Sequence, residues 1–137
     1  MSNLTGKVVI VTGASRGIGA AAAVALAKQG ATVMLTARDG KLAGDVAQSI
    51  VAAGGIASAR ACDVSDYKAV EGLVAETIGR FGRLDVLHNN AGGSTSRDGL
   101  VTEADLTEFW RVIGVDLFGM ILGCRFGIPQ MIKSGGG

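Results

Sequence analysis

One stretch, residues 8–30, constrains the fold of this chain more than any other, because a glycine-rich loop joins an apolar run to an alanine-rich segment. Val8 to Val11 are four consecutive apolar residues, all β-branched, as is typical of a strand buried on both faces. Ile18 to Gln29 carry apolar residues at helical spacing, and Gly30 is a suitable stop for a helix. The sequence therefore predicts a buried strand that turns directly into a helix.

The turn between them carries glycines at positions 13, 17 and 19, in the spacing G-x-x-x-G-x-G. A helix N-terminus presents unpaired N–H groups and a partial positive charge, which suit a phosphate group. Glycine permits a tight turn and lets a ligand approach the backbone. The spacing gives a longer turn than the usual dinucleotide fingerprint G-x-G-x-x-G. We interpret the loop as a phosphate-binding loop; the alternative is a strand–helix turn packed for structure alone.

The alternation of strand and helix continues along the chain. Three further strands are predicted over residues 32–37, 56–62 and 84–88. The order βαβαβαβα predicts an α/β fold with a parallel sheet and helices on both faces. We expect the strand order 3-2-1-4 and a single domain over residues 1–137.

Local signals mark the ends of the later helices. The third helix is expected to begin at a Ser65 cap and to close at Gly82. A long apolar helix is expected to begin near Ala104, where Thr102 and Asp105 resemble a capping box.

Composition narrows the possible functions. Lys plus Arg number 13 and Asp plus Glu 12, so no basic surface indicates a nucleic-acid partner. No charge-free apolar run approaches the ~18 residues of a membrane span, and the N-terminal residues lack the features of a signal peptide; we expect no membrane partner and a cytoplasmic location. Cys62 and Cys124 lack a C-x-x-C spacing and are expected to be free, buried thiols. His88 is the only histidine, which excludes a histidine-based metal cluster.

Glycine and polar residues fall where the predicted strands end. Gly13 to Gly19, Arg38, Asp63 and Asn90 follow four different strands. Ligands of open parallel sheets bind at the carboxyl ends of the strands. We therefore expect these residues to form one binding site.

Three motifs together resemble the short-chain dehydrogenase/reductase family: Thr12-Gly13-Ala14-Ser15-Arg16-Gly17-Ile18-Gly19, then Asp63-Val64, then Asn89-Asn90-Ala91-Gly92. They come in the family's order and at its approximate separations, and the resemblance covers the whole chain. It implies a Rossmann-type, doubly wound sheet that binds NAD(P). It also implies hydride transfer between a nicotinamide cofactor and a small-molecule carbonyl or alcohol, in a protein that forms homo-oligomers.

The resemblance also assigns roles in cofactor binding. It places the pyrophosphate and the adenosine phosphate on residues of the glycine turn, namely Gly13, Ser15, Arg16, Gly17, Ile18 and Gly19. Asp63 would hydrogen-bond the adenine amino group beside Val64, or simply form a turn after its strand. Asn90, Ala91 and Gly92 would lie along the riboses, a role that can coexist with a structural turn. The family gives His88 no role, so it is interpreted as a residue that fills strand space.

The choice between nicotinamide cofactors depends on the end of the second strand. NAD enzymes of this fold usually place an acidic side chain there, against the ribose 2′-hydroxyl. The corresponding residue is Ala37, and Arg38 and Arg16 lie nearby in the family's pattern. Because arginine binds phosphate oxygens in a bidentate way, we favour NADP over NAD. The alternative is two ordinary solvated arginines, with Asp39 as an ion-pair partner.

The family's groups for proton transfer are not found in these residues. The family uses a serine and a tyrosine with a lysine four residues later, which lowers the tyrosine pKa. Tyr67 is the only tyrosine; Lys68 follows it at the wrong spacing, and we interpret it as a surface residue. The family's groups follow a fifth strand, which would begin after Gly137. We therefore interpret the chain as the N-terminal part of a longer reductase, truncated before strand five and inactive alone.

One further position departs from the family's pattern. Asp116 occupies the place of an asparagine that helps a proton relay. An ionised aspartate accepts hydrogen bonds but donates none, which puts the relay role in doubt.

Two alternatives to an oxidoreductase remain open. One is a non-catalytic nucleotide-binding or scaffold domain, since everything present serves binding. The other is a methyltransferase that binds S-adenosylmethionine. Such a protein is expected to have an acidic residue at the end of strand two for the ribose hydroxyls, whereas this chain has Ala37 and Arg38 there.

Overall fold

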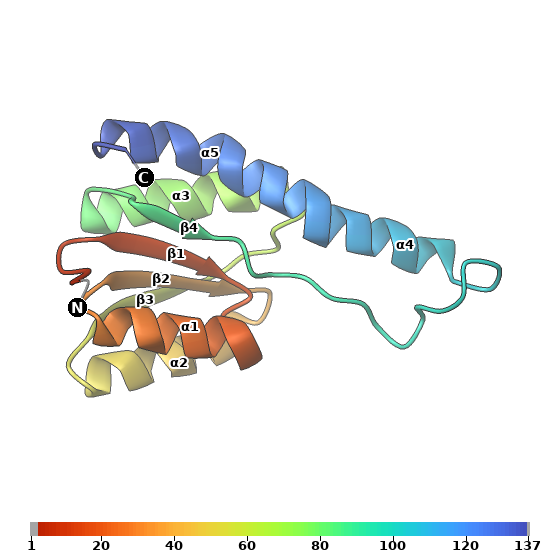
Figure 1. Cartoon of the computed structure of the whole chain (residues 1–137), viewed down its shortest axis with the longest axis horizontal. Coiled ribbons are helices and arrows are strands. Elements are labelled where there is room, and N and C mark those ends of the chain that lie inside the picture. Colours follow the sequence, from red (N-terminus) through yellow and green to blue (C-terminus); the bar gives the residue numbers. More distant parts are fainter. Residues whose placement is uncertain (1–2, 137) are drawn as a thin grey trace.

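The computed structural model describes residues 3–136 and contains one parallel sheet between two layers of helices (Figure 1). The strands are β1 (Val8–Thr12), β2 (Thr32–Ala37), β3 (Ile56–Ala61) and β4 (Val86–His88). Between them run α1 (Gly17–Lys28), α2 (Gly40–Ala52) and α3 (Tyr67–Phe81). After β4 come α4 (Leu106–Val112), the π-helical turn η1 (Ile113–Phe118) and α5 (Gly119–Lys133).

The sheet has the order β3-β2-β1-β4, and every pairing is parallel. Val9 of β1 pairs with Val33 of β2 on one side and with Val86 of β4 on the other. The predicted Rossmann-like topology is therefore confirmed. The predicted strand ends differ from the observed ones by at most two residues; β4 begins at Val86 rather than at residue 84.

Alternate residues of the central strand supply two separate cores, because successive side chains point to opposite faces. Val9 and Val11 pack with α1 and α2, where Ala23 and Ala27 allow close approach. Ile10 packs on the other face against α3 and α5. Figure 1 shows α1 and α2 below the sheet and α3 and α5 above it. All five residues of β1 are buried, as expected of a central strand.

Two predicted helix starts are wrong by one or two residues. The cap of α3 is Asp66, whose carboxylate accepts from the Ala69 N–H at 2.8 Å. Ser65 lies one residue before this cap, and its hydroxyl donates to Asp63 at 2.6 Å. Similarly, Asp105 is itself the cap of α4 and accepts from the Thr107 N–H at 2.8 Å, so the helix begins after it. The predicted C-terminal stop of α3 is confirmed, since Gly82 adopts a left-handed conformation with φ +76°.

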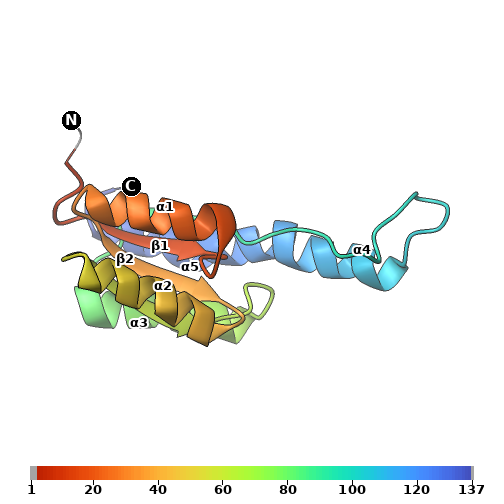
Figure 2. The same cartoon turned by 90° about the horizontal axis from the view of Figure 1, so that it is seen from below.

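The segments α4, η1 and α5 form one long rod, and α4 projects beyond the sheet (Figures 1 and 2). The rod is long and apolar enough to cross a bilayer by length and composition, and only 22% of its most apolar window is buried. The core helix of a globular domain meets the same criteria, so the expected absence of a membrane partner stays a prediction. Cys124 lies on α5 and is exposed, contrary to the expectation of two buried thiols; Cys62 is buried as expected.

An ionic cluster ties the amino end of the sheet together. Asp85 is only 3% exposed, and its carboxylate accepts from Arg83 at 2.7 and 2.6 Å and from Lys7 at 3.1 Å. It also accepts from the backbone N–H of Val8 at 3.0 Å. Arg83 in turn donates to the carbonyl of Ser134, at the end of α5. One carboxylate therefore joins the starts of β1 and β4 and, through Arg83, the end of the last helix.

We predict that Asp85→Ala destabilises the full-length protein by about 2–3 kcal/mol, because it removes charged hydrogen bonds and leaves a buried N–H unpaired. The hydrogen bonds from Arg83 hold the pKa of Asp85 well below its usual range. A lowered folded-state pKa stabilises the protein fully above the unfolded value of about 4 and progressively less as the pH falls below it. Urea unfolding at pH 7 and pH 3 should show the wild-type advantage shrinking at the lower pH.

The matched control is Glu71→Ala, which removes an exposed pair with Lys68 on α3. It should change the free energy of unfolding by no more than about 0.5 kcal/mol at either pH. Equal changes in the free energy of unfolding for Asp85→Ala and Glu71→Ala would contradict the stabilising role assigned to Asp85.

Candidate functional site

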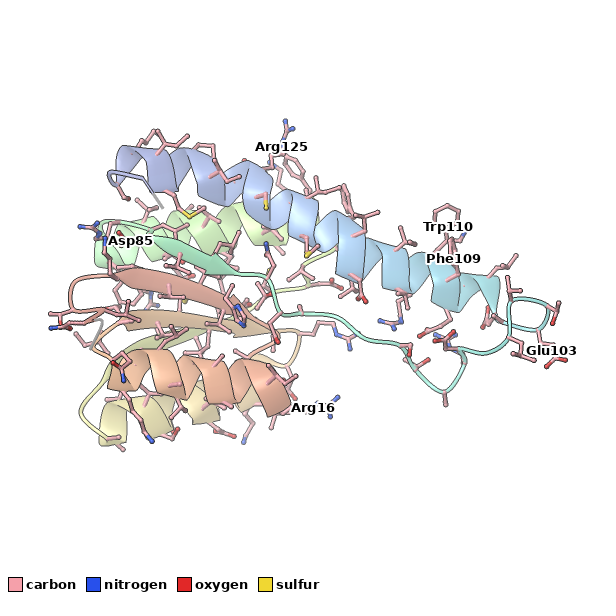
Figure 3. The ribbon with its side chains drawn as sticks, in the orientation of Figure 1. Arg16, Asp85, Glu103, Phe109, Trp110 and Arg125 are labelled. Atoms are coloured by element: carbon pink, nitrogen blue, oxygen red, sulfur yellow. The ribbon has the colours of Figure 1, made fainter. Side chains whose placement is uncertain are left out.

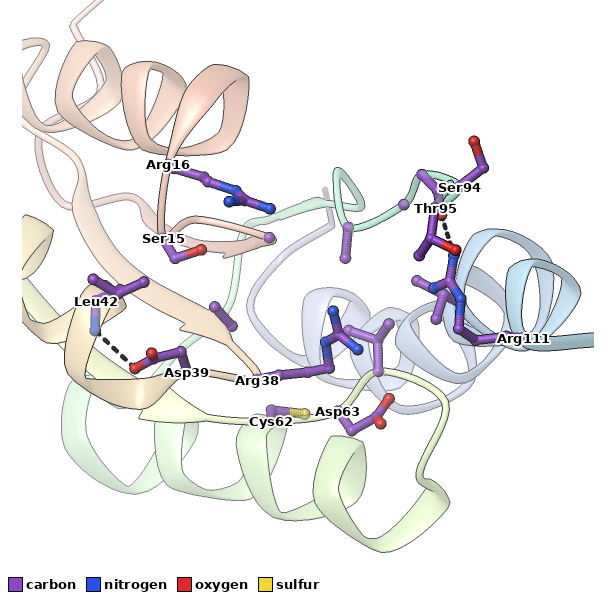
Figure 4. A pocket seen from close by; sticks show the side chains of 17 residues that line it. Ser15, Arg16, Arg38, Asp39, Leu42, Cys62, Asp63, Ser94, Thr95 and Arg111 are labelled. Carbon is purple, nitrogen blue, oxygen red and sulfur yellow. Dashed lines mark hydrogen bonds between the residues drawn. The ribbon is translucent and has the colours of Figure 1, made fainter. Parts of the chain in front are cut away.

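A cleft of about 540 Å³ opens at the carboxyl ends of the strands. Its walls come from the turn after β1, the ends of β2 and β3, the segment after β4, and two residues of the long rod, Arg111 and Val115 (Figure 4). The sequence analysis expected these strand ends to meet, and they do. Figure 3 shows Arg16 at this end of the sheet and Asp85 at the opposite end of the sheet.

The turn between β1 and α1 favours glycine at three positions, two of them for lack of space. A Cβ at Gly13 would lie 2.9 Å from the Cα of Ala91, and φ there is +66°. A Cβ at Gly19 would overlap the carbonyl oxygen of Gly13. Gly17 has open space around it and is required by its φ of +57° instead. The glycines therefore serve close packing and chain reversal, the structural role given above as the alternative, and phosphate binding by the loop stays a prediction.

The turn is locked to the end of β4 by hydrogen bonds. The hydroxyl oxygen of Thr12 accepts from the backbone N–H groups of Asn90 and Ala91, both at 3.0 Å. The Asn90 side-chain amide donates to the carbonyls of Thr12 at 3.0 Å and Gly13 at 3.3 Å. Asn90 thus has the structural role offered as its alternative, and it does not line the cleft. The role of Thr12 was missed, because it depends on a strand 78 residues away in the sequence.

The N-terminus of α1 faces the cleft without a side-chain cap. Arg16 occupies the N-cap position in an extended conformation and makes no capping hydrogen bond, whereas the aspartates at the same position of α2, α3 and α4 do. The first N–H groups of a helix need partners from outside it. This end of α1 therefore has the polarity and the unshared donors that suit an anion.

Two exposed arginines border the cleft. Arg16 comes from the glycine turn and Arg38 from the end of β2, and Figure 4 shows both side chains extending over the same hollow. Among residues 3–136 neither arginine forms a salt bridge. Asp39, the expected competitor, instead caps α2 by accepting from the N–H groups of Lys41 and Leu42 at 3.0 and 3.1 Å.

Asp63 forms the turn that was considered as its alternative role. Its Oδ1 accepts from the Ser65 N–H at 2.9 Å and from the Ser65 hydroxyl at 2.6 Å. These bonds, chiefly the one from the hydroxyl, lower the pKa of Asp63. The residue also lines the cleft, as do its neighbours Cys62 and Val64. Burial raises the pKa of the Cys62 thiol to about 11, so this wall is uncharged at Cys62 and anionic at Asp63.

The opposite end of the cleft contains groups that the sequence analysis missed. Gly93, Ser94, Thr95, Arg111 and Val115 line it. The signal for Arg111 was weak, since it stands three residues from Glu108 in a helix with many apolar residues. Only the fold brings the segment after β4 against that helix.

The predicted residues therefore divide into two groups. Those on the cleft wall are Gly13, Ser15, Arg16, Arg38, Asp63, Val64, Ala91 and Gly92. Those outside it are Gly17, Ile18, Gly19 and Asn90. Ile18 is 79% exposed on the first turn of α1. Asp116 contacts the segment after β4 from the π-helical turn.

His88 stays outside the site. Its backbone carbonyl accepts from the Thr12 hydroxyl at 3.4 Å. In the described part of the chain its Nε2 is buried and has no hydrogen-bond partner, which is compatible with a residue that fills strand space.

A parallel sheet in this order, with a glycine turn at the carboxyl end of its central strand, defines the Rossmann-like class. The family model described as short chain dehydrogenase matches residues 7–137, and the chain belongs to that family. The expectation from the three motifs is confirmed.

Known relatives agree with this assignment. An uncharacterized oxidoreductase of Methylorubrum extorquens is 45% identical over 98% of this chain and 54% of its own length. A 7alpha-hydroxysteroid dehydrogenase of Clostridium sardiniense is 39% identical over 100% of this chain and 53% of its own. A crystal structure of a metagenomic short-chain oxidoreductase in complex with NADP superposes with a TM-score of 0.91 and 43% identity, covering 99% of this chain and 61% of that one. The chain thus spans about half the length of the curated relatives it matches.

The geometry of the turn predicts that Gly19→Ala destabilises the full-length protein by about 1–3 kcal/mol, as overpacking typically does. The control is Gly44→Ala in α2, where an added Cβ meets nothing within 4 Å; it should stabilise the protein by about 0.5–1 kcal/mol. Urea unfolding of both variants tests the contrast. A Gly19→Ala variant as stable as Gly44→Ala would mean that the turn is looser than described.

Proposed function

We propose that the protein carrying this chain is an NADP-dependent oxidoreductase, which transfers a hydride between the nicotinamide and a carbonyl or alcohol. In this proposal, residues 1–137 are the part that binds the cofactor. The single observation that carries the choice of NADP is the pair Arg16 and Arg38, unpaired within the described residues, beside the small Ala37. The similar structure with bound NADP supports the same choice. NAD remains the alternative cofactor.

The residues present fit such a dinucleotide. The turn is tight, because a Cβ at Gly13 or Gly19 would meet atoms of the protein itself, and Gly13 contributes to the cleft wall without a side chain. The uncapped N-terminus of α1 would hold the pyrophosphate. Arg16 and Arg38 would bind the 2′-phosphate by charged hydrogen bonds.

Other residues of the cleft would hold the remaining parts of the cofactor. Asp63 would accept from the adenine amino group, next to Val64. Ala91 and Gly92 would lie along the riboses. When bound, the nicotinamide supplies or accepts the hydride.

Proton transfer is proposed to come from residues beyond this chain. Tyr67, the one tyrosine of the chain, packs edge-on against Phe126 with ring centroids 4.9 Å apart, and it does not line the cleft. A non-catalytic nucleotide-binding domain is the alternative that this observation favours. A serine and a Tyr-x-x-x-Lys motif in the sequence that follows Gly137 would support the enzyme; their absence would support the alternative.

The proposed partners follow from the same family. The relative from Clostridium sardiniense is named for a hydroxysteroid, which supports a small-molecule carbonyl or alcohol as the substrate class. Exposed apolar side chains on the long rod support assembly into a homo-oligomer; they include Phe109, Trp110, Leu117 and Ile121. In Figure 3, Phe109 and Trp110 point away from the sheet on the projecting helix. The cytoplasm remains the expected location, with neither nucleic acid nor membrane as a partner.

Cofactor preference tests the first part of the proposal. The full-length protein should bind NADPH more tightly than NADH, and Arg38→Asp should weaken NADPH binding about 10- to 150-fold, since a charged hydrogen bond contributes about 1.5–3 kcal/mol. Isothermal titration calorimetry with both nucleotides measures this. Arg80→Asp, which makes the same charge change on the exposed face of α3, should leave both affinities unchanged. Equal affinity of the unmutated protein for NADH and NADPH would defeat the proposal of NADP.

The chain by itself should lack reductase activity and should self-associate. A hydride transferred to a carbonyl leaves an alkoxide that needs a proton, and Asp116, when ionised, has none to give. The free edge of β4 and the apolar rod would be exposed to water, and each 100 Å² of apolar surface left exposed forfeits about 2.5 kcal/mol. Residues 1–137 should therefore be tested for NADPH oxidation with a panel of carbonyls and by size-exclusion chromatography. A monomer that turns over substrate would refute both expectations.

A further inference from the structure

In the segment that follows β4, Gly93 is bound to the long rod through both its N–H and its carbonyl. The N–H of Gly93 donates to the carboxylate of Asp116, at 3.1 Å to Oδ1 and 3.4 Å to Oδ2. The carbonyl of the same residue accepts from Nη2 of Arg111 at 2.6 Å. Gly93 has φ +117°, a conformation that favours glycine. The long rod therefore clamps Gly93 between an anionic acceptor, Asp116, and a cationic donor, Arg111. Glycine has the widest choice of backbone conformations of any residue.

A buried carboxylate anchors this clamp. Glu108 is only 1% exposed, and it accepts from Nε and Nη2 of Arg111 at 2.9 and 2.8 Å. It also accepts from the backbone N–H of Thr95 at 2.7 Å. The bonds from Arg111, above all, lower the pKa of Glu108 to about 2, so the anchor is ionised at neutral pH. Gly93 and Thr95 are thus both fixed to the rod through their backbones.

The π-helical turn explains how Asp116 reaches the clamp. In a regular α-helix, residues five apart point about 140° away from each other, since each residue turns by about 100°. Arg111 and Asp116 are five apart, yet both bind Gly93. The turn η1, with its wider i to i+5 hydrogen bonding, lies between them and includes Asp116. The local departure from α-helical geometry brings the two side chains to the same residue, Gly93.

The clamped segment is the wall of the cleft opposite the two arginines. Gly92, Gly93, Ser94 and Thr95 line this end, and Figure 4 shows Ser94, Thr95 and Arg111 across the hollow from Arg16. If the 2′-phosphate binds at the arginines, the other half of the dinucleotide must extend toward this wall. The position of Gly92 is sensitive to the clamp as well, because a Cβ there would lie 3.1 Å from Asp116 Oδ1.

We propose that Asp116 and Arg111 are positioning residues, which fix the wall at Gly92–Thr95 and so set the affinity for the nicotinamide half of the cofactor. This inference rests on the proposed function. It gives Asp116 a role that an ionised carboxylate performs well, namely accepting from a backbone N–H. The adenosine half, held at the other end of the cleft, is independent of the clamp.

The test compares two ligands on the full-length protein by isothermal titration calorimetry: NADPH, and 2′,5′-ADP as the adenosine half alone. Asp116→Ala should weaken NADPH about tenfold, as expected for a lost charged hydrogen bond. It should leave the affinity for 2′,5′-ADP within about twofold of wild type. Asp116→Asn should keep the affinity for NADPH within about threefold of the wild-type value, because the amide oxygen still accepts from the Gly93 N–H.

Two more variants complete the experiment. Arg111→Lys keeps the charge but cannot bridge Glu108 and Gly93, so it should weaken NADPH selectively, as Asp116→Ala does. It carries the test if Asp116→Ala does not fold. Asp45→Ala removes an exposed carboxylate paired with Lys41 on α2 and should change neither affinity.

The outcomes distinguish a failure of the positioning role from a failure of the proposed function. Unchanged NADPH affinity in both Asp116→Ala and Arg111→Lys would overturn the inference. So would a parallel loss of NADPH and 2′,5′-ADP binding, because that result indicates a general effect on folding. Wild-type protein that binds neither ligand would overturn the proposed function itself.

Discussion

The hydroxyl of Thr12 is the point on which the cleft depends. At the carboxyl end of the sheet, the segment after β1 turns toward one face and the segment after β4 toward the other. The backbone hydrogen bonds between these two adjacent strands therefore end there. There the Thr12 hydroxyl oxygen accepts from the N–H groups of Asn90 and Ala91. The Asn90 side-chain amide in turn donates to the carbonyls of Thr12 and Gly13. Buried or half-buried polar groups are expensive to leave unpaired. These bonds therefore fix the spacing between the glycine turn and the segment after β4, and with it the width of the cleft.

The two ends of the sheet use charge in opposite ways. At the amino end, Asp85 is saturated by Arg83, Lys7 and a backbone N–H. At the carboxyl end, Arg16 and Arg38 border a cleft without a salt bridge among residues 3–136. Paired charges hold strands together, whereas unpaired ones attract an anionic ligand. The strands thus separate the paired charges at one end of the sheet from the unpaired arginines at the other.

The sequence was sufficient for the strands, because the period of apolar residues and the glycine stops are local signals. The alternation of strands and helices also indicated a parallel sheet with helices on both faces. The sequence was also sufficient for most of the cleft wall, since parallel strands bring their ends to one edge. It was insufficient where neighbouring side chains compete for one role. Ser65 was a reasonable cap, but the carboxylate of Asp66 occupies the cap position. The Asn90 amide donates to Thr12 and Gly13, a structural role that can coexist with the predicted contact to a ribose. The contacts of Asp116 and Arg111 with Gly93 could not be predicted from the sequence, because they depend on a π-helical turn that the spacing of apolar residues does not indicate.

That turn also fixes the phase of everything after it. Gly123 and Gly127 of α5 lie against Leu87 of β4, where added Cβ atoms would come within 3.2 and 3.3 Å of its side chain. Each residue of an α-helix rotates the following ones by about 100°. Regular α-helical geometry over the same residues would rotate α5 by about 100° relative to the sheet, carry both glycines off the strand and place larger side chains there instead. The wider turn therefore keeps the small residues of α5 against β4, whereas substitutions on the exposed face of the rod leave this register unchanged.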